Sequence, residues 1–170
     1  QPNSTLRPLL LHRLYPYLST SVFGGDAYLK TFFGKNLDNI DDPFYSHRLR
    51  WQNTARCLRF LSPEIQAEIK GYDPLAELAE SLPSKFEKWD HFAQAQYLEI
   101  NIFLSGYLLS SQGDRMGMAH SVEGRYPFLD PRVVDFSVGL PAHYKMYGLR
   151  EKAVLKRAMQ DFLPPSTINR

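Results

Sequence analysis

The sequence predicts an all-helical fold, or one very close to it, from how its segments begin and from how their apolar residues are spaced. Four segments open with Asp-Pro or Ser-Pro, at Asp42-Pro43, Ser62-Pro63, Asp73-Pro74 and Asp130-Pro131. An oxygen-bearing side chain can cap free backbone amides, and proline is tolerated in the first helical turn. Apolar residues three and four apart follow each start, whereas no alternating strand pattern with hairpin turns is found. We therefore expect one helical unit over residues 1–170.

The expected helices follow these starts in order. "GGDAYL" at 24–29 is interpreted as a helix start capped by Asp26, and a longer helix is expected from about Pro43 to Phe60. The capped starts at Ser62 and Asp73 predict two further helices. "SLPSKFEKWD" at 81–90 is expected to connect helices and not to separate domains.

The longest predicted helix runs from about His91 to Ser111, and its apolar residues cover most of its circumference. Helices of that kind are usually central to a core, so this one is expected to be buried on most sides. A last helix is expected in "LREKAVLKRAMQDFL", 149–163, and Pro164-Pro165 should end it. Its inward residues are predicted to be Val154, Leu155 and Ala158.

Composition narrows the class of protein. With 170 residues, 44% hydrophobic and 22% charged, the chain has the size and composition of one globular domain. Net charge is +2, and the main basic stretch, "LREKAVLKR" at 149–157, has the spacing of a solvated helix face, so nucleic-acid binding is not expected. No apolar run reaches the roughly 20 residues of a membrane helix, and the N-terminus lacks a signal-peptide pattern, so a cytoplasmic protein is expected.

Individual reactive or bulky residues are given structural interpretations. Cys57 is the only cysteine and lies in a helical pattern, where an inert buried thiol in a reducing compartment is expected. The five histidines are scattered without the spacing of metal ligands, so no metal site is predicted. Trp51 and Trp89 are expected in the core or in a connection, and Glu99 and Asn101 in a structural polar network.

The stretch "GDRMGMAHSVEGRYPFLD", residues 113–130, mixes charge with glycine and aromatic residues directly after the most apolar segment. Asp114 and Arg115 are adjacent on a helix, so each needs a separate partner. Because Tyr126 precedes a proline, residues 122–126 are expected to be extended. Alternation then places Glu123 and Arg125 on one side, and Gly124, with Val122 and Tyr126, on the other. An ion-pair network and a binding site are both compatible with this spacing, whereas Asp130 is interpreted as a helix cap.

These residues closely resemble a known signature. The pattern D-R-M-x-M-A-H-S-x-E-x-R-x-P-F-L-D occurs in the C-terminal part of the asparagine synthetase (glutamine-hydrolysing) family, and here it runs from Asp114 to Asp130. "PRVVDFSVGLP" and "GLREKAVLKRAMQDFLPPSTINR" continue the resemblance. The clear match covers residues 100–170, and residues 1–99 match only loosely.

The resemblance implies an ATP-dependent ligase that makes asparagine from aspartate. Members hydrolyse glutamine in a glutaminase domain and pass ammonia through a tunnel to an adenine-nucleotide alpha-hydrolase-like synthetase domain. There, with ATP and Mg²⁺, the aspartate carboxylate becomes an acyl-adenylate. Adenylation supplies the leaving group that a carboxylate lacks, and the tunnel protects ammonia from water. The implied partners are the glutaminase and nucleotide-binding domains, with a homodimer allowed and neither nucleic acid nor membrane expected.

Three departures from the family indicate a helical region separated from its nucleotide-binding core. The pyrophosphate loop Ser-Gly-Gly-x-Asp-Ser is absent, Cys57 is not in the context of the catalytic cysteine, and the family's phosphate-contacting lysine would fall after Arg170. We therefore expect this chain to be an excised, inactive part that binds neither ATP nor Mg²⁺ alone.

The signature also supplies candidate site residues. By resemblance, the lining of the ammonia tunnel maps onto Gly113, Gly124 and Tyr126, although Tyr126 is bulkier than the small aliphatic residue often found there. Glu123 and Arg125 are expected to brace the segment, with substrate contact as the minority alternative for Arg125. Asp114 and Arg115 are expected to brace the end of the helix. Two other interpretations remain open, a non-catalytic helical interaction module and a relative with another carboxylate substrate, such as a β-lactam-forming synthetase.

Overall fold

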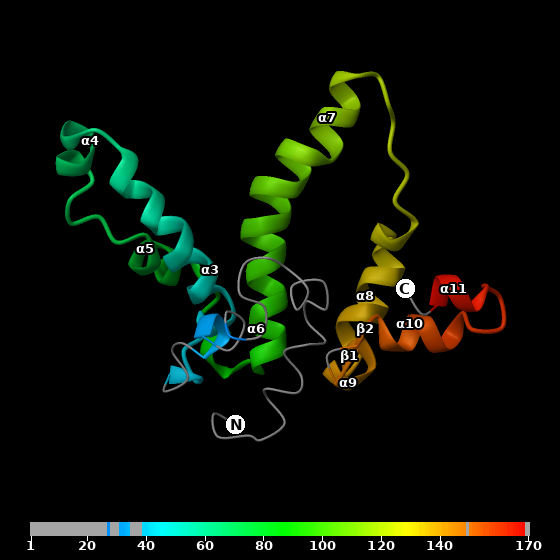
Figure 1. Cartoon of the computed structure of the whole chain (residues 1–170). Helices are drawn as coiled ribbons and strands as arrows, with labels where there is room; N and C mark the ends of the chain where they lie inside the picture. Colours follow the sequence, from blue (N-terminus) through cyan, green and yellow to red (C-terminus); the bar gives the residue numbers. More distant parts are fainter. Residues whose placement is uncertain (1–26, 28–30, 35–38, 149, 169–170) are drawn as a thin grey trace. The chain divides into compact units, whose positions relative to one another are not determined.

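The computed structural model describes residues 27, 31–34, 39–148 and 150–168 (Figure 1). Within these ranges the regular structure is almost entirely helical, which confirms the predicted fold class. The chain divides into two compact units, with Thr31–Leu108 in unit 2 and Leu109–Arg170 in unit 1. Whether both act as one domain stays a prediction, and the predicted helix start at Asp26 lies outside the described residues.

Unit 2 consists of helices joined by short connections. In chain order they are α3 (Tyr45–Ala55), η3 (Arg56–Phe60), α4 (Pro63–Glu68), α5 (Pro74–Ser81), η4 (Phe86–Lys88), α6 (His91–Leu98) and the π-helical η5 (Glu99–Gln112), which continues into unit 1. Among the described helices, none is long and apolar enough to cross a membrane.

The predicted caps explain where two of these helices begin. The Ser62 hydroxyl accepts a hydrogen bond from the Ile65 amide at 3.5 Å, and the Asp73 carboxylate accepts one from the Leu75 amide at 2.9 Å. The helix predicted to begin at about Pro43 begins two residues later, because α3 starts at Tyr45. There Asp42 accepts the Phe44 amide at 2.9 Å and pairs with Arg48, which makes a turn before the helix.

The core of unit 2 is small and aromatic. Its fully buried apolar side chains are Phe86, with 1% exposed, and Leu98, with 0% exposed, and Phe44 joins them. Trp51 and Trp89 pack against this core, as predicted. Because Phe86 lies in the connection over 81–90, that segment both joins helices and supplies a central core residue.

The long helical stretch from His91 to Gln112 confirms the predicted length but not the predicted burial. Ile100 is 55% exposed, Tyr107 43% and Leu109 38%. The side chain of Asn101 donates to the Tyr97 carbonyl at 2.9 Å, and the Ser105 hydroxyl donates to the Asn101 carbonyl. Side-chain donors to the carbonyl four residues earlier compete with the α-helical bonds, which is consistent with the wider π-helical turn of η5.

A polar cluster joins α3 to the start of η5. Glu99 accepts a hydrogen bond from Arg50 at 2.6 Å and lies 3.4 Å from Nε2 of His47. His47 is 2% exposed. Burial lowers the pKa of its imidazole, and the negative charge of Glu99 only partly offsets this effect. The predicted structural role of Glu99 is therefore confirmed. The prediction for Cys57 was wrong, because its thiol is exposed on η3.

Unit 1 holds the signature and the C-terminal helices. Its further elements are α7 (Asp114–Ala119), η6 (Pro127–Leu129), α8 (Pro131–Gly139), α9 (Ala142–Lys145), β1 (Met146–Tyr147), β2 (Arg150–Glu151), α10 (Ala153–Ala158) and α11 (Pro165–Ile168).

The β1–β2 hairpin corrects the prediction for residues 149–163. Met146 pairs with Glu151 and Tyr147 with Arg150, and Gly148 adopts a φ of +53° in the turn. The helix can therefore begin only after this hairpin. The predicted inward face was also wrong in part, because Val154 is half-buried whereas Leu155 and Ala158 are exposed.

Candidate functional site

The signature begins with helix α7, which ends in a Schellman motif. The Val122 amide donates to the Gly117 carbonyl at 2.9 Å, and the Ser121 amide donates to the Met118 carbonyl at 3.1 Å. Ser121 occupies the left-handed position, with a φ of +59°, where glycine is the usual residue. A Cβ on Gly117 would lie 3.2 Å from the Val122 carbonyl oxygen, so the small residue lets the chain turn back closely. This ending directs residues 122–126 away from the helix.

Tyr126 connects the end of the extended segment to the start of α7. Its hydroxyl donates a hydrogen bond to the Asp114 carboxylate at 3.2 Å. This bond, with the negative charge of Asp114, raises the pKa of the Tyr126 hydroxyl, because ionisation would remove the donor and place two negative charges together. The partner of Asp114 is thus a tyrosine twelve residues away that spacing alone did not identify, and the bracing role of Asp114 stays a prediction.

Gly124 and Tyr126 depend on each other for space. A Cβ at position 124 would collide with the Tyr126 ring, so the ring lies against the glycine backbone. The two residues therefore share one side of the segment, as the alternation predicts. The absence of a side chain at 124 leaves the space that the Tyr126 ring occupies.

Glu123 and Arg125 form an ion pair on the other side of the segment, also as the alternation predicts. Their side chains are 72% and 79% exposed, and both residues of the pair belong to one short stretch of chain. An exposed pair of this kind contributes little to stability, about 0–1 kcal/mol. In the described structure the pair does not join other elements, so its predicted bracing role is not tested by this chain alone.

The remaining candidates are less connected. Gly113 immediately precedes α7 at its N-cap position. Arg115 is exposed and has no hydrogen-bond or ion-pair partner among the described residues. The structure thus brings Asp114, Gly124 and Tyr126 together, pairs Glu123 with Arg125 and leaves Arg115 apart.

The signature ends in the predicted cap. The Asp130 carboxylate accepts a hydrogen bond from the Arg132 amide at 2.9 Å and pairs with the Arg132 guanidinium at 2.8 Å. The hydrogen bonds from the Arg132 guanidinium have the larger effect and the one from the Arg132 amide the smaller, and together they hold the pKa of Asp130 below its usual range. The structural interpretation of Asp130 is confirmed, since its side chain is engaged at the start of α8.

Large apolar side chains are exposed throughout the signature. Six apolar or aromatic residues are each at least 47% exposed: Met116, Met118, Val122, Tyr126, Phe128 and Leu129. Exposed apolar surface on this scale is typical of an interaction surface. The polar candidates are thus set among side chains that favour contact with another surface.

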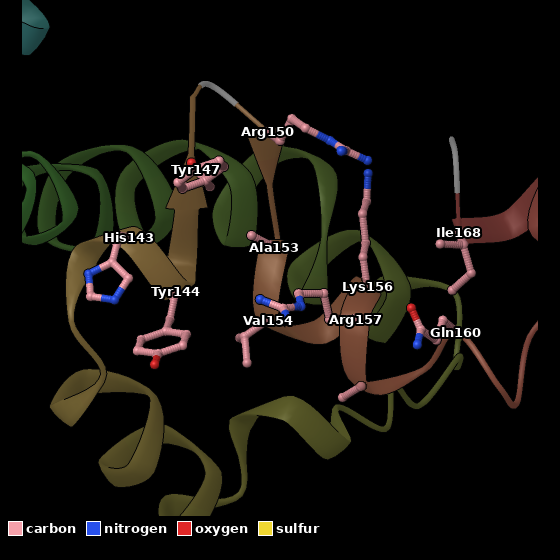
Figure 2. A pocket seen from close by; sticks show the side chains of 11 residues that line it. His143, Tyr144, Tyr147, Arg150, Ala153, Val154, Lys156, Arg157, Gln160 and Ile168 are labelled. Carbon is pink, nitrogen blue, oxygen red and sulfur yellow. The ribbon is translucent and has the colours of Figure 1, made fainter.

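A separate cavity of about 880 Å³ lies among the C-terminal elements of unit 1 (Figure 2). Its described lining includes none of the seven signature candidates and instead comes from α9, the β1–β2 hairpin, α10, Gln160 and α11. The basic stretch at 149–157 was interpreted as a solvated face. Its density of positive charge was the only signal in the sequence that pointed to this cavity, because the hairpin that shapes it was not predicted.

The described residues do not provide a magnesium site. No group of three histidine, cysteine, aspartate or glutamate side chains is placed to hold a metal ion within the described ranges. The described carboxylate, thiol and imidazole groups therefore do not fit the Mg²⁺ that the family resemblance implies. The sequence also lacks the Ser-Gly-Gly-x-Asp-Ser loop that the resemblance associates with pyrophosphate.

Comparison with known proteins agrees with the signature. The asparagine synthase family model matches residues 11–170. A Mycobacterium bovis protein with the provisional name asparagine synthetase (glutamine-hydrolysing) is 35% identical over 124 residues, which cover 71% of this chain and 19% of that protein. The chain belongs to the asparagine synthase family. The match extends well into the region where the signature-based resemblance was loose.

Two other relatives cover shorter stretches. Asparagine synthetase (glutamine-hydrolysing) 3 of Bacillus subtilis is 36% identical over 77 residues, which cover 45% of this chain and 12% of that protein. Amidase chry2 of Gibberella zeae is 30% identical over 89 residues, 49% of this chain and 13% of that protein. No solved structure matches the chain. The chain thus spans about a fifth or less of the length of these curated relatives.

Proposed function

We propose that this chain is the helical part of an ATP-dependent, glutamine-hydrolysing amide ligase that forms asparagine from aspartate. The observation that carries the proposal is the complete signature from Asp114 to Asp130, which lies inside the stretch matched by the family. In this proposal, ATP activates the aspartate carboxylate as an acyl-adenylate, and ammonia from glutamine displaces the adenylate. The glutaminase and nucleotide-binding domains, with ATP and Mg²⁺, are placed in other parts of the protein, and the chain alone is proposed to be inactive.

The part played by this chain is to wall the route by which ammonia reaches the activated carboxylate. Three features of the signature support that role: the contact of Tyr126 with Gly124, the hydrogen bond from Tyr126 to Asp114, and the exposed apolar side chains around them. Tyr126 lies against Gly124 and bonds to Asp114, which makes a compact surface that lacks a free carboxylate at this point. The surrounding apolar side chains are exposed and favour contact with another domain. Such a surface would limit the entry of water, which competes with ammonia for the acyl-adenylate.

Arg125 is the residue that best tests the proposal. Its guanidinium contacts Glu123 and is otherwise exposed, so its removal should have little effect on folding. In the full-length protein that carries this chain, we expect Arg125→Ala to reduce asparagine formation by about tenfold or more while glutamine hydrolysis is retained. A loss of one charged hydrogen bond at the reacting end corresponds to an effect of this size.

Arg132→Ala is the matched control, because Arg132 is also an exposed arginine paired with a nearby carboxylate and lies just outside the signature. It should leave both activities close to their original values. Equal loss of glutaminase and synthetase activity in Arg125→Ala would contradict the proposal. The same assay should also measure amide formation from other carboxylates, because one of the relatives is named an amidase and not an asparagine synthetase.

The proposal also predicts how the chain behaves by itself. Calorimetric titration of the 170-residue chain with Mg-ATP should show no binding tighter than about 10 µM, which corresponds to roughly 7 kcal/mol. The reason is that the sequence has no Ser-Gly-Gly-x-Asp-Ser loop to supply phosphate-binding amides. Micromolar binding would show that the nucleotide site had been misplaced. A helical interaction module without nucleotide chemistry would instead be favoured if the full-length protein also failed to bind Mg-ATP.

A further inference from the structure

The segment from the last turn of α3 to the end of α5, residues 52–81, is largely exposed, and we call it the arm. Every residue from 52 to 68 is exposed. The large apolar side chains of the arm include Phe60, which is 75% exposed, Ile65 at 45% and Tyr72 at 62%. Apolar side chains this exposed and this closely spaced are typical of a surface that contacts another molecule.

Charge is divided between the two halves of the arm, which meet at Ser62. The first half, 52–62, carries two arginines and no acidic residue. The second half, 63–81, carries one lysine and five acidic residues, which are Glu64, Glu68, Asp73, Glu77 and Glu80. A positive surface and a negative surface are therefore joined end to end in one short stretch of chain.

Several of these charges have no partner within the described part of the chain. Arg56, Glu68 and Glu80 make no side-chain hydrogen bond or ion pair among the described residues. The guanidinium of Arg59 lies 4.7 Å from the centre of the Phe60 ring and contacts no described carboxylate. Unpaired charges of both signs on one exposed surface select a partner that carries both signs in return.

We propose that the arm docks on the same arm of a second copy of this chain. In a two-fold contact each patch meets its counterpart, so every contact occurs twice. With the axis near Ser62, the basic η3 of one copy faces the acidic α4 of the other, and Phe60 and Ile65 become enclosed between them. A nucleic acid or an anionic membrane would be repelled by the acidic half, whereas a second copy satisfies both halves.

Sedimentation equilibrium of the 170-residue chain measures this association against the monomer mass of 19.7 kDa. We expect a monomer–dimer equilibrium with a dissociation constant of about 10–100 µM, which is typical of a small, transient interface. Added salt should weaken the dimer several-fold, because the paired charges lie at an exposed surface.

Charge reversal tests whether the two halves of the arm meet. Arg56→Glu/Arg59→Glu makes both halves acidic, and Glu68→Lys/Glu80→Lys gives the arm an excess of positive charge. Each double variant alone should associate at least about tenfold more weakly than the unaltered chain, because like charges then face each other. An equimolar mixture of the two variants should recover the affinity to within about threefold, since opposite charges face each other again. Recovery in the mixture also shows that both variants fold.

Lys85→Glu/Lys88→Glu is the matched control for the first double variant. Both lysines are exposed in unit 2 but lie outside the arm, and their reversal changes the net charge by the same amount. The control should leave the dissociation constant unchanged.

A spin label on Cys57 locates the contact. Cys57 is the only cysteine, and its exposed thiol lies on η3, so a nitroxide can be attached at a single position of the arm. When the labelled chain is mixed with ¹⁵N-labelled chain that carries no nitroxide, the amide signals of residues 64–68 in the second copy should broaden. The reason is that the proposed contact places η3 of one copy beside α4 of the other.

Four outcomes would overturn the inference. The first is a chain that stays monomeric up to about 500 µM, a range that covers the expected affinity. The second is equal weakening by Lys85→Glu/Lys88→Glu, which would indicate an effect of net charge alone. The third is a mixture of the two reversed chains that does not associate although circular dichroism shows both to be folded. The fourth is broadening confined to unit 1, which would assign the association to the exposed apolar side chains of the signature.

The inference is independent of the proposed function, because none of the arm residues lies in the Asp114–Asp130 signature. Its failure would leave the Arg125→Ala prediction unaffected, since that prediction concerns amide formation in the full-length protein.

Discussion

Leu98→Ala tests whether the small core of unit 2 holds this unit together. Leu98 is 0% exposed and belongs to one cluster with Phe44 and Phe86. The substitution removes three carbon atoms, which corresponds to about 2.4 kcal/mol at roughly 0.8 kcal/mol for each buried CH₂ group. The cavity left behind adds to this value, so the expected loss is about 2.5–5 kcal/mol. A loss of that size is a large fraction of the stability of a small domain.

Tryptophan fluorescence during urea unfolding measures this loss. The chain has two tryptophans, and Trp51 and Trp89 both pack against the Leu98 cluster. Their emission should therefore report on unit 2. Leu58→Ala is the matched control, because Leu58 lies in the same unit and is 49% exposed, and it should cost less than about 1 kcal/mol. If both substitutions lowered the unfolding free energy equally, the core described for unit 2 would be wrong.

Two further predictions concern pH and the signature. Burial lowers the pKa of His47, so as the pH falls below about 6.5 the unfolded chain takes up its proton first and the stability of unit 2 should decrease. His47→Gln should flatten this dependence of the urea midpoint, whereas His91→Gln, at a side chain that is 68% exposed, should not. Gly124→Ala should displace the Tyr126 ring and return the pKa of its hydroxyl toward the usual value. NMR titration of the ring carbon bonded to oxygen would show this, and an unchanged pKa would contradict the contact with Asp114.

Features that depend on neighbouring residues were predictable from the sequence. Ser62, Asp73 and Asp130 cap helices because an oxygen atom and nearby amides are joined by a few bonds of chain. The pairing of Glu123 with Arg125 follows from the alternation of an extended segment. In these cases the partner lies within three residues, so local geometry is sufficient.

Features that depend on distant partners were not predictable. The burial of His47 beside Glu99 joins residues that are 52 positions apart, and the Tyr126 hydroxyl reaches back to Asp114. The exposed sides of η5 show the same limit, since an apolar circumference indicates that a helix favours burial but not whether another element covers it.

The sequence by itself determined the helical class, three of the four helix caps proposed before a proline and the signature that places the chain in the asparagine synthase family. Only the tertiary structure decided which groups far apart in the sequence meet. It set Tyr126 against Gly124 and gathered Arg150, Lys156 and Arg157 around one cavity. The physical reason is that caps and alternation are set by a few consecutive backbone torsions, whereas a cavity requires the β1–β2 hairpin and the helices beside it to fold back on one another.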